Sequence, residues 1–378
     1  MRAVVLGGGR VGAAMVRDLA ADDTFDVTLV DASEATLAHF SGEDVTCDKA
    51  DLSRAEEVRR VVADQDLVIG AVPGPMGFET VRTVLEAGKN IVDISFFEQD
   101  AFELQEAAEK HGVVCLVDCG VAPGASNLIL GRMEAELDAV SSFVCYVGGL
   151  PVARRWPYEY KAPFSPIDVI AEYTRPVRLR EHGRDVVRPA LGRPEMLHFD
   201  GIGTLEAFET DGLRSLMKTS DVPTMVEKTL RYPGHREKMQ MLRDTGFFAE
   251  EPTTLRDGTT VRPVDLTAEL LFKEWKAEPG EEEFTVLRVI VEGVRDGRSV
   301  RHTFDLFDRT DAATGTSSMA RTTGYTCTAM ARLVASGAYR EVGVSPPEKV
   351  GRIRDCYDRV MADLEARGVH YRETVEEL

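Results

Sequence analysis

The first 118 residues alternate short apolar runs with amphipathic stretches, which is typical of β-strands that alternate with α-helices. The predicted strands are 2–6, 27–30, 45–47, 67–72, 90–94 and 113–117, and the predicted helices are 10–21, 53–63, 76–88 and 99–111. This alternation implies βαβ units, a parallel sheet and right-handed crossovers. Six such strands suit an α/β fold with a doubly wound Rossmann-type sheet, which binds a dinucleotide at the carboxyl ends of its strands.

The pattern changes near Val140, where short extended runs are separated by loops rich in glycine and proline. Two of these runs, 284–294 and 299–307, flank Asp296-Gly297 and predict a β-hairpin with a tight turn. We therefore expect a second α+β domain, built on a mostly antiparallel sheet.

Helical periodicity returns over 318–336 and over 346–367. Because the last helices of such chains often return to the nucleotide-binding domain, we assign 319–378 to the first domain. The predicted domains are therefore 1–124 together with 319–378, and 125–318.

A glycine-rich loop, Gly7-Gly8-Gly9-Arg10-Val11-Gly12, joins the first strand to the first helix. Its first, third and sixth positions are glycine, which allows a sharp turn, a close approach of backbone to a pyrophosphate, and close packing of helix on strand. The loop therefore predicts dinucleotide binding by Gly7, Gly9, Arg10, Val11 and Gly12. An ordinary turn between a strand and a helix is the alternative.

Asp31 ends the second strand and stands about 20 residues beyond the last of these glycines, where an acidic side chain can accept hydrogen bonds from an adenosine ribose. A carboxylate there would repel a 2′-phosphate, so we expect NAD rather than NADP, with Ala32 beside the ribose. Asp51 follows the third strand and is expected near the adenine, or else as the N-cap of the helix at 53–63.

Two further segments follow strands of the first domain and are expected near the dinucleotide. Ala71, Val72 and Pro73 follow the fourth strand, where small residues allow contact with the nicotinamide-side ribose, although this proline could mark only a tight turn. Asp118–Asn127 follows the sixth strand and leads into a helix whose N–H groups could meet the nicotinamide or the substrate.

Composition and charge narrow the class of protein. With 378 residues, 43% of them hydrophobic, the chain can bury two cores, and no apolar run approaches the ~20 residues of a membrane span. The six cysteines form no CxxC pair, which favours a reducing cytoplasm without zinc sites, and we interpret Cys119 as a packing residue. A net charge of −19 opposes binding to nucleic acid or an anionic membrane.

Several segments distributed along the chain resemble those of the saccharopine dehydrogenase-like family, and within it most closely the L-lysine 6-dehydrogenases. The segments are Gly70–Gly74, Asp93–Phe97, Asp118–Asn127, Val147–Pro151, Phe164–Pro166, Glu172–Pro176, Asp211–Ser215 and Thr229–His235. The resemblance implies a Rossmann domain, a second domain that carries substrate residues and the subunit contact, and a homodimer.

The resemblance also implies an NAD-dependent oxidoreductase that acts on a CH–NH bond of an amino acid. The expected reaction is oxidative deamination of L-lysine at the ε-carbon to allysine, which cyclises to piperideine-6-carboxylate. One alternative is a saccharopine-type dehydrogenase or reductase that forms or cleaves a secondary amine. Another is a non-catalytic NAD-sensing protein.

Oxidation of an ε-ammonium requires a group that first takes its proton, and a group that activates water for attack on the iminium. The candidates are Asp118 at a strand end, Lys161 and His235. Each has a plain alternative: Asp118 could cap the helix that begins near Pro123, Lys161 could be a solvated side chain, and His235 could be an exposed helix start.

The α-carboxylate of the substrate needs a planar bidentate donor, for which arginine is suited best, and the α-ammonium needs a carboxylate or a carbonyl. The candidate clamp residues are Arg214 and Arg231, each of which could instead form an internal salt bridge. Saccharopine would require two clamp arginines, so Arg231 distinguishes the two substrates. The expected chemistry requires no metal.

Overall fold

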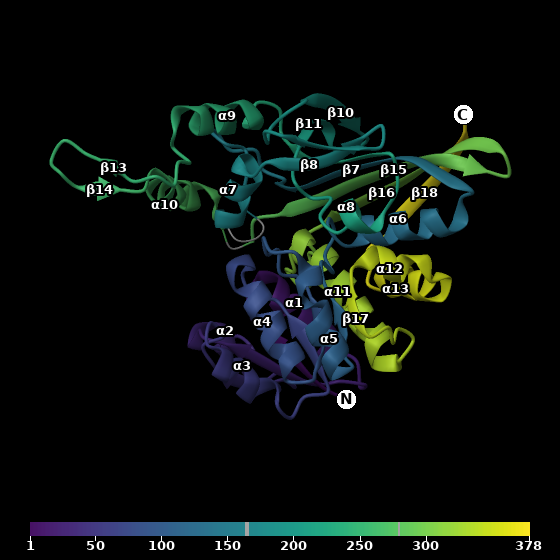
Figure 1. The fold of residues 1–378 in the computed structure, drawn as a ribbon. Helices are drawn as coiled ribbons and strands as arrows, with labels where there is room; N and C mark the ends of the chain where they lie inside the picture. Colours follow the sequence, from purple (N-terminus) through teal and green to yellow (C-terminus); the bar gives the residue numbers. More distant parts are fainter. Residues whose placement is uncertain (163–165, 279) are drawn as a thin grey trace. The chain divides into compact units, whose positions relative to one another are not determined.

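The computed structural model describes residues 1–162, 166–278 and 280–378, and it divides into two compact units (Figure 1). Unit 1 comprises 1–139, 294–297 and 319–371, and unit 2 comprises 140–293, 298–318 and 372–378. Phe164 and Ser165 of the family-like segments lie outside the described residues.

Unit 1 contains a seven-stranded sheet of order β17-β6-β5-β4-β1-β2-β3, in which all six neighbouring pairs are parallel. The strands are β1 (Arg2–Leu6), β2 (Asp26–Asp31), β3 (Thr46–Lys49), β4 (Leu67–Gly70), β5 (Asn90–Asp93), β6 (Val114–Leu116) and β17 (Gly343–Ser345). The predicted Rossmann-type fold is confirmed. β17 was not predicted, because a strand of three residues carries too little periodicity.

The helices of this unit follow the predicted order, with one addition at 34–38. They are α1 (Arg10–Ala20), α2 (Glu34–Ala38), α3 (Ala55–Val62), α4 (Gly74–Glu86), η1 (Ala101–Leu104), α5 (Gln105–His111), α6 (Ala125–Glu136), α11 (Ser318–Ser336), α12 (Pro347–Arg352) and α13 (Arg354–Ala366). The helical region predicted at 346–367 is confirmed, and it forms two helices, α12 and α13, because Ile353 between them adopts an extended backbone with φ −88° and ψ 106°.

The boundaries of the units differ from the prediction at three places, one of which is the hairpin turn Val294–Gly297, which belongs to unit 1. Helix α6, which we assigned to the second domain, belongs to unit 1 because it packs tightly on α12. A Cβ built on Gly131 would lie 2.0 Å from the carbonyl oxygen of Glu348, so only glycine permits this approach. Residues 372–378 belong to unit 2 instead, because β18 (Tyr371–Glu377) pairs with β16 (Arg298–Arg309).

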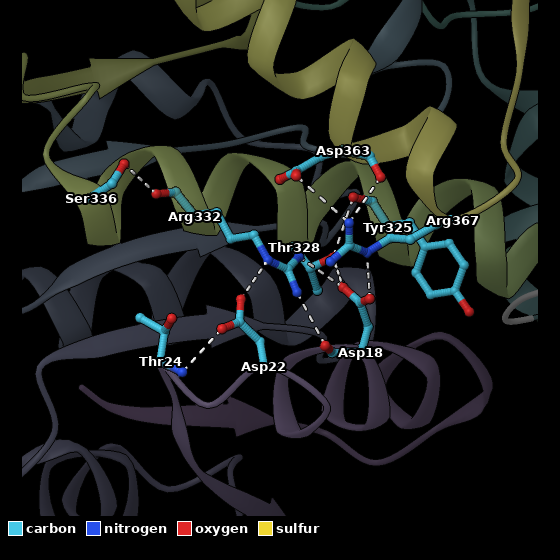
Figure 2. A network of polar contacts seen from close by, with 9 residues as sticks. All are labelled: Asp18, Asp22, Thr24, Tyr325, Thr328, Arg332, Ser336, Asp363 and Arg367. Atoms are coloured by element: carbon cyan, nitrogen blue, oxygen red, sulfur yellow. Dashed lines mark hydrogen bonds and ion pairs between the residues drawn. The ribbon is translucent and has the colours of Figure 1, made fainter.

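A polar network within unit 1 holds the C-terminal helices to α1 (Figure 2). The Asp18 carboxylate accepts hydrogen bonds from Arg332 of α11 at 2.9 Å, from Arg367 after α13, and from the Thr328 hydroxyl. Arg332 also donates to Asp22 at 3.1 Å. Two arginines from the end of the chain thus converge on one aspartate near its start.

Unit 2 is built on a nine-stranded sheet whose main path is β10-β11-β12-β7-β15-β16-β18. Besides β16 and β18, this sheet contains β7 (Ala139–Pro151), β8 (Val177–Glu181), β9 (Arg184–Arg188), β10 (Glu195–Phe199), β11 (Gly203–Glu209), β12 (Thr224–Arg231) and β15 (Glu283–Arg295). Strands β8 and β9 lie off the main path. The helices are α7 (Pro166–Thr174), α8 (Leu216–Thr219), α9 (His235–Thr245) and α10 (Pro263–Trp275), and β13 (Thr253–Thr254) pairs with β14 (Thr260–Val261) in a small hairpin. The sheet is mixed, because β12 runs parallel to β7.

The predicted hairpin is confirmed as β15 and β16. Asp296 and Gly297 at its turn have φ values of +52° and +74°, as a turn of type I′ requires. No helix within the described part of the chain is long and apolar enough to cross a membrane.

Candidate functional site

The glycine loop of unit 1 forms a tight cradle between β1 and α1. Gly7 has φ +106°, and a Cβ built on it would lie 2.6 Å from the Ala71 carbonyl oxygen. A Cβ on Gly12 would lie 2.0 Å from the Gly7 carbonyl oxygen, whereas a Cβ on Gly9 would meet no atom within 4 Å. The backbone therefore requires glycine at 7 and 12, and the open face at Gly9 suits the approach of a ligand.

The N-terminus of α1 carries the positive end of an 11-residue helix to this loop. Gly9 is its N-cap and provides no side-chain hydrogen bond, and the exposed Arg10 and the half-buried Val11 are its first two residues. The first N–H groups of a helix attract a phosphate. This loop thus fits the diphosphate of a dinucleotide.

Asp31 is fixed beside the cradle at the end of β2. Its two carboxylate oxygens accept hydrogen bonds from the N–H groups of Gly8 and Ser33, both at 2.8 Å. Each oxygen retains capacity for a further hydrogen bond, so the carboxylate can bind ribose hydroxyls. Nearby, the ammonium of Lys49 pairs with Glu34 at 2.6 Å, and Ala32 is exposed.

The loops after β3 and β4 carry the other residues predicted near the dinucleotide. Asp51 is exposed and accepts hydrogen bonds from Ser53, which lower the pKa of its carboxyl. Its alternative reading as a helix N-cap is wrong, because the N-cap of α3 is Arg54. After β4, Ala71 and Val72 lead to Pro73, which is the N-cap of α4.

One aspartate, Asp93, ends β5, and another, Asp118, follows the adjacent strand β6. Asp93 is fully buried and accepts hydrogen bonds from Ser95 N–H at 2.8 Å and from its hydroxyl at 3.0 Å. Asp118 is 3% exposed and adopts φ +57°. The helix-cap alternative for Asp118 is wrong, because Gly124 is the N-cap of α6.

Cys119 is buried beside Asp118, and burial raises the pKa of its thiol well above the usual value. A thiol of this kind does not ionise at neutral pH and is a poor nucleophile. Its interpretation as a packing residue is therefore supported.

In unit 2, Arg231 lies at the end of β12 and is enclosed, with 3% of its surface exposed. Its guanidinium donates to the Glu172 carboxylate at 2.9 Å and to the Leu230 carbonyl at 3.0 Å. The Tyr173 hydroxyl accepts from its Nε at 3.4 Å, and the Tyr160 ring lies 4.5 Å from its Cζ. Arg231 thus forms the internal ion pair that was the alternative to substrate binding.

His235 is the first residue of α9 and is 1% exposed, so the expectation of an exposed helix start is wrong. Its Nδ1 donates to the Tyr158 carbonyl at 2.9 Å, and its Nε2 therefore accepts from the Tyr173 hydroxyl at 3.0 Å. Burial, together with the charge of Arg231, lowers the pKa of this imidazole to about 3. A neutral ring with both nitrogens engaged is poorly suited to proton transfer.

Lys161 is also largely buried, contrary to the solvated alternative. Its ammonium donates to the carbonyls of Glu274 and Lys276 at 2.8 and 2.9 Å, and it lies 3.9 Å from Glu281. These carbonyls belong to the C-terminal end of α10, so Lys161 fastens that helix. This engagement argues against a role as the base.

Arg214 lies in the loop before α8, where it is half-buried and adopts φ +47°. Its charge acts on Glu227 of β12, which is 6% exposed and which we did not predict as a site residue. The signal for Glu227 was the alternation along β12, which places Met225, Glu227, Thr229 and Arg231 on one buried face.

The fold and the cradle together define a dinucleotide-binding protein of the Rossmann class with a second α+β unit. The family described as "Saccharopine dehydrogenase NADP binding domain" matches residues 3–116, and "Saccharopine dehydrogenase C-terminal domain" matches residues 120–369. The chain belongs to the saccharopine dehydrogenase family, and unit 1 carries its nicotinamide dinucleotide-binding domain.

Similar proteins include an alpha-aminoadipic semialdehyde synthase of Arabidopsis thaliana, 26% identical over 64% of this chain and 25% of that protein. A saccharopine dehydrogenase [NADP(+), L-glutamate-forming] of Saccharomyces cerevisiae is 25% identical over 66% of this chain and 58% of that protein. The matches thus span less than two thirds of these relatives. The solved structure of an apo saccharopine dehydrogenase (L-Glu forming) from the same yeast has a TM-score of 0.81, with 19% identity and 99% of both chains covered, and it shares the fold.

Proposed function

We propose that this protein is an NAD-dependent oxidoreductase that oxidises the ε-carbon of L-lysine, releasing ammonia and an aldehyde that cyclises. Lysine has a single carboxylate, so its binding needs one bidentate clamp, whereas saccharopine would require two. Arg214 would bind that carboxylate.

The observation that supports lysine is the pairing of Arg231 with Glu172 inside unit 2. A second substrate carboxylate would need a second arginine, and Arg231 is already neutralised by a carboxylate of the protein itself. A ligand carboxylate at Arg231 would have to displace Glu172 and break this partly buried ion pair, which is unfavourable.

Asp31 supports NAD as the cofactor, because its carboxylate would repel a 2′-phosphate. NAD+ supplies the acceptor for the hydride when it is bound. Of the three candidates for the base, Asp118 remains, because Lys161 fastens α10 and His235 is enclosed as a neutral ring. We assign proton removal from the substrate ammonium to Asp118.

A saccharopine-type reaction is the second candidate, and the names of the relatives favour it. The yeast relative is named for NADP(+) and for glutamate formation, and the matching domain is named for NADP binding. In this reaction a secondary amine is oxidised and the resulting imine is hydrolysed to glutamate and an aldehyde.

The decisive experiment measures initial rates of the purified full chain with L-lysine or saccharopine, each with NAD+ or NADP+. Lysine with NAD+ is expected to give reduced cofactor and ammonia. Turnover of saccharopine but not lysine would overturn the proposal that lysine is the substrate. A preference for NADP+ would overturn the proposal that Asp31 selects NAD. Binding of NADH without turnover of either amino acid would instead indicate a sensor.

A further inference from the structure

Glu227 is a buried carboxyl whose Oε2 has no hydrogen-bond partner among the described residues. A Cβ built on Gly212 would lie 1.0 Å from this oxygen, so the carboxyl rests directly on the backbone of the loop that also carries Arg214. An unsatisfied buried carboxyl oxygen is costly, and such groups call for a physical explanation.

The neighbouring carboxylates each have an arginine partner. Glu172 pairs with Arg231 at 2.9 Å and Asp211 with Arg178 at 2.8 Å, while Glu227 forms no such ion pair within the described ranges. Burial raises the pKa of Glu227 well above its usual value, and the charges of Glu172 and Asp211 raise it further, while Arg214 lowers it. Glu172 lies on α7, whereas Asp211 and Arg214 both lie on the loop between β11 and α8.

This arrangement places an acid and an arginine within electrostatic reach of each other at the loop 211–215. An α-amino acid head group presents the complementary pair, a carboxylate and an ammonium on one carbon. A carboxylate held by Arg214 would bring the ammonium into the neighbourhood of Glu227, where a cation would satisfy the unpaired oxygen.

We propose that Glu227 receives the α-ammonium of the amino acid whose carboxylate Arg214 binds. The inference rests on the proposed function, because it takes Arg214 as the clamp. It assigns to Glu227 the selection of α-amino acids over carboxylates or amines that lack one of the two groups.

The test compares three probes that keep or lose one group: L-lysine, 6-aminohexanoate without the α-amine, and cadaverine without the carboxylate. Binding to the NADH-bound full chain is measured by calorimetry, so turnover is not required. The wild type is expected to bind lysine about 10- to 100-fold more tightly than 6-aminohexanoate, as a charged hydrogen bond provides. Glu227→Gln is expected to remove most of this preference and to leave NADH affinity unchanged.

A proton balance separates this role from a structural one. If Glu227 is protonated in the free protein and ionised against an ammonium, binding of lysine releases a proton, which the dependence of the binding enthalpy on the buffer reveals. Glu227→Gln is expected to abolish that release. The matched control is Glu209→Gln, because Glu209 is equally buried with an unpartnered Oε2 but pairs with Arg188 at 3.3 Å. This control is expected to retain the release.

Gly212→Ala provides a second variant, because its added Cβ would displace the Glu227 carboxyl while the side chain of Glu227 stays. It should reproduce the loss of preference. Equal preference for lysine in the wild type and both Glu227 and Gly212 variants, with NADH still bound, overturns the inference. The proposed function fails separately, if the full chain with NAD+ does not oxidise lysine.

Discussion

At the scale of single residues, the charges inside unit 2 fall into pairs. Arg231 is matched by Glu172, Asp211 by Arg178, and Glu209 by Arg188. A buried charge is costly unless it is paired, and each of these three carboxylates has an arginine partner within the unit. Glu227 differs from these carboxylates, because its Oε2 has no hydrogen-bond partner among the described residues.

Arg214→Ala is expected to raise the KM for lysine strongly, by about 10- to 100-fold, because the carboxylate loses a bidentate, charge-assisted partner. NAD affinity should stay near that of the wild type. Steady-state kinetics with varied lysine and separately varied NAD+ check this. An unchanged KM for lysine would refute the clamp role.

Replacing Asp31 tests the cofactor preference. Asp31→Ser combined with Ala32→Arg removes the repulsive carboxylate and adds a cation for the 2′-phosphate. The ratio of kcat/KM for NADP+ to that for NAD+ is expected to rise about 10-fold or more. Ser33→Arg alone, with Asp31 retained, is the control. A wild type that already uses both cofactors equally would contradict this reading.

The buried neutral His235 predicts a dependence of stability on pH. Its pKa is about 3 in the fold and near 6.5 when unfolded, so the unfolded state binds the extra proton between these values. Its contribution is therefore complete above pH 6.5 and is lost as the pH falls toward 3. His235→Gln should flatten the decline of Tm across this window relative to the wild type, whereas His198→Gln at an exposed position should not. Parallel curves of Tm against pH for the wild type and His235→Gln would disprove this contribution of His235.

At the scale of elements, the sequence could predict those that depend on local pattern but not those that depend on tertiary contacts. The Rossmann strands, the glycine loop and the Asp296-Gly297 hairpin are encoded by neighbours in sequence, and their ranges lie within a few residues of the observed ones. The break at Ile353, the short strand β17 and the membership of α6 depend on packing between distant segments, which one-dimensional periodicity does not contain.

The candidate site shows the same division. Gly7, Gly12 and Asp31 act through backbone geometry that the motif itself specifies. The burial of His235 and Lys161, in contrast, is created by Tyr173 and by the end of α10, which lie far away in sequence. Glu227 was overlooked because a charged residue in a strand is usually taken to face solvent.

The attachment of the C-terminal helices to α1 can be tested at Asp18. Asp18→Asn leaves Arg332 and Arg367 without their shared carboxylate in a partly buried setting and is expected to cost about 3 kcal/mol of unfolding free energy. Chemical denaturation measures this loss. Asp355→Asn, which removes an exposed partner of Arg359, should change stability by less than about 0.5 kcal/mol. Equal losses of unfolding free energy in the two variants would refute the role of Asp18 in this attachment.

At the scale of the whole molecule, the two units are interleaved along the chain. Unit 1 begins at residue 1, is interrupted by most of unit 2, and resumes at 319, where it supplies the seventh strand and three helices. The dinucleotide-binding unit is therefore not a separable N-terminal fragment. Its stability and that of the inserted unit are expected to depend on the same chain continuity.

The order of synthesis gives this interleaving a consequence. While a ribosome makes the chain, β1 to β6 emerge first, but Arg332, β17 and Arg367 follow only after the whole of β7 to β16. Until then Asp18 lacks its two arginine partners and the edge of β6 is not covered by β17. The nascent Rossmann sheet therefore remains incomplete and can pair with a wrong strand. Completion of the seven-stranded sheet is thus timed to the synthesis of β17, which follows the inserted unit, rather than to that of β6.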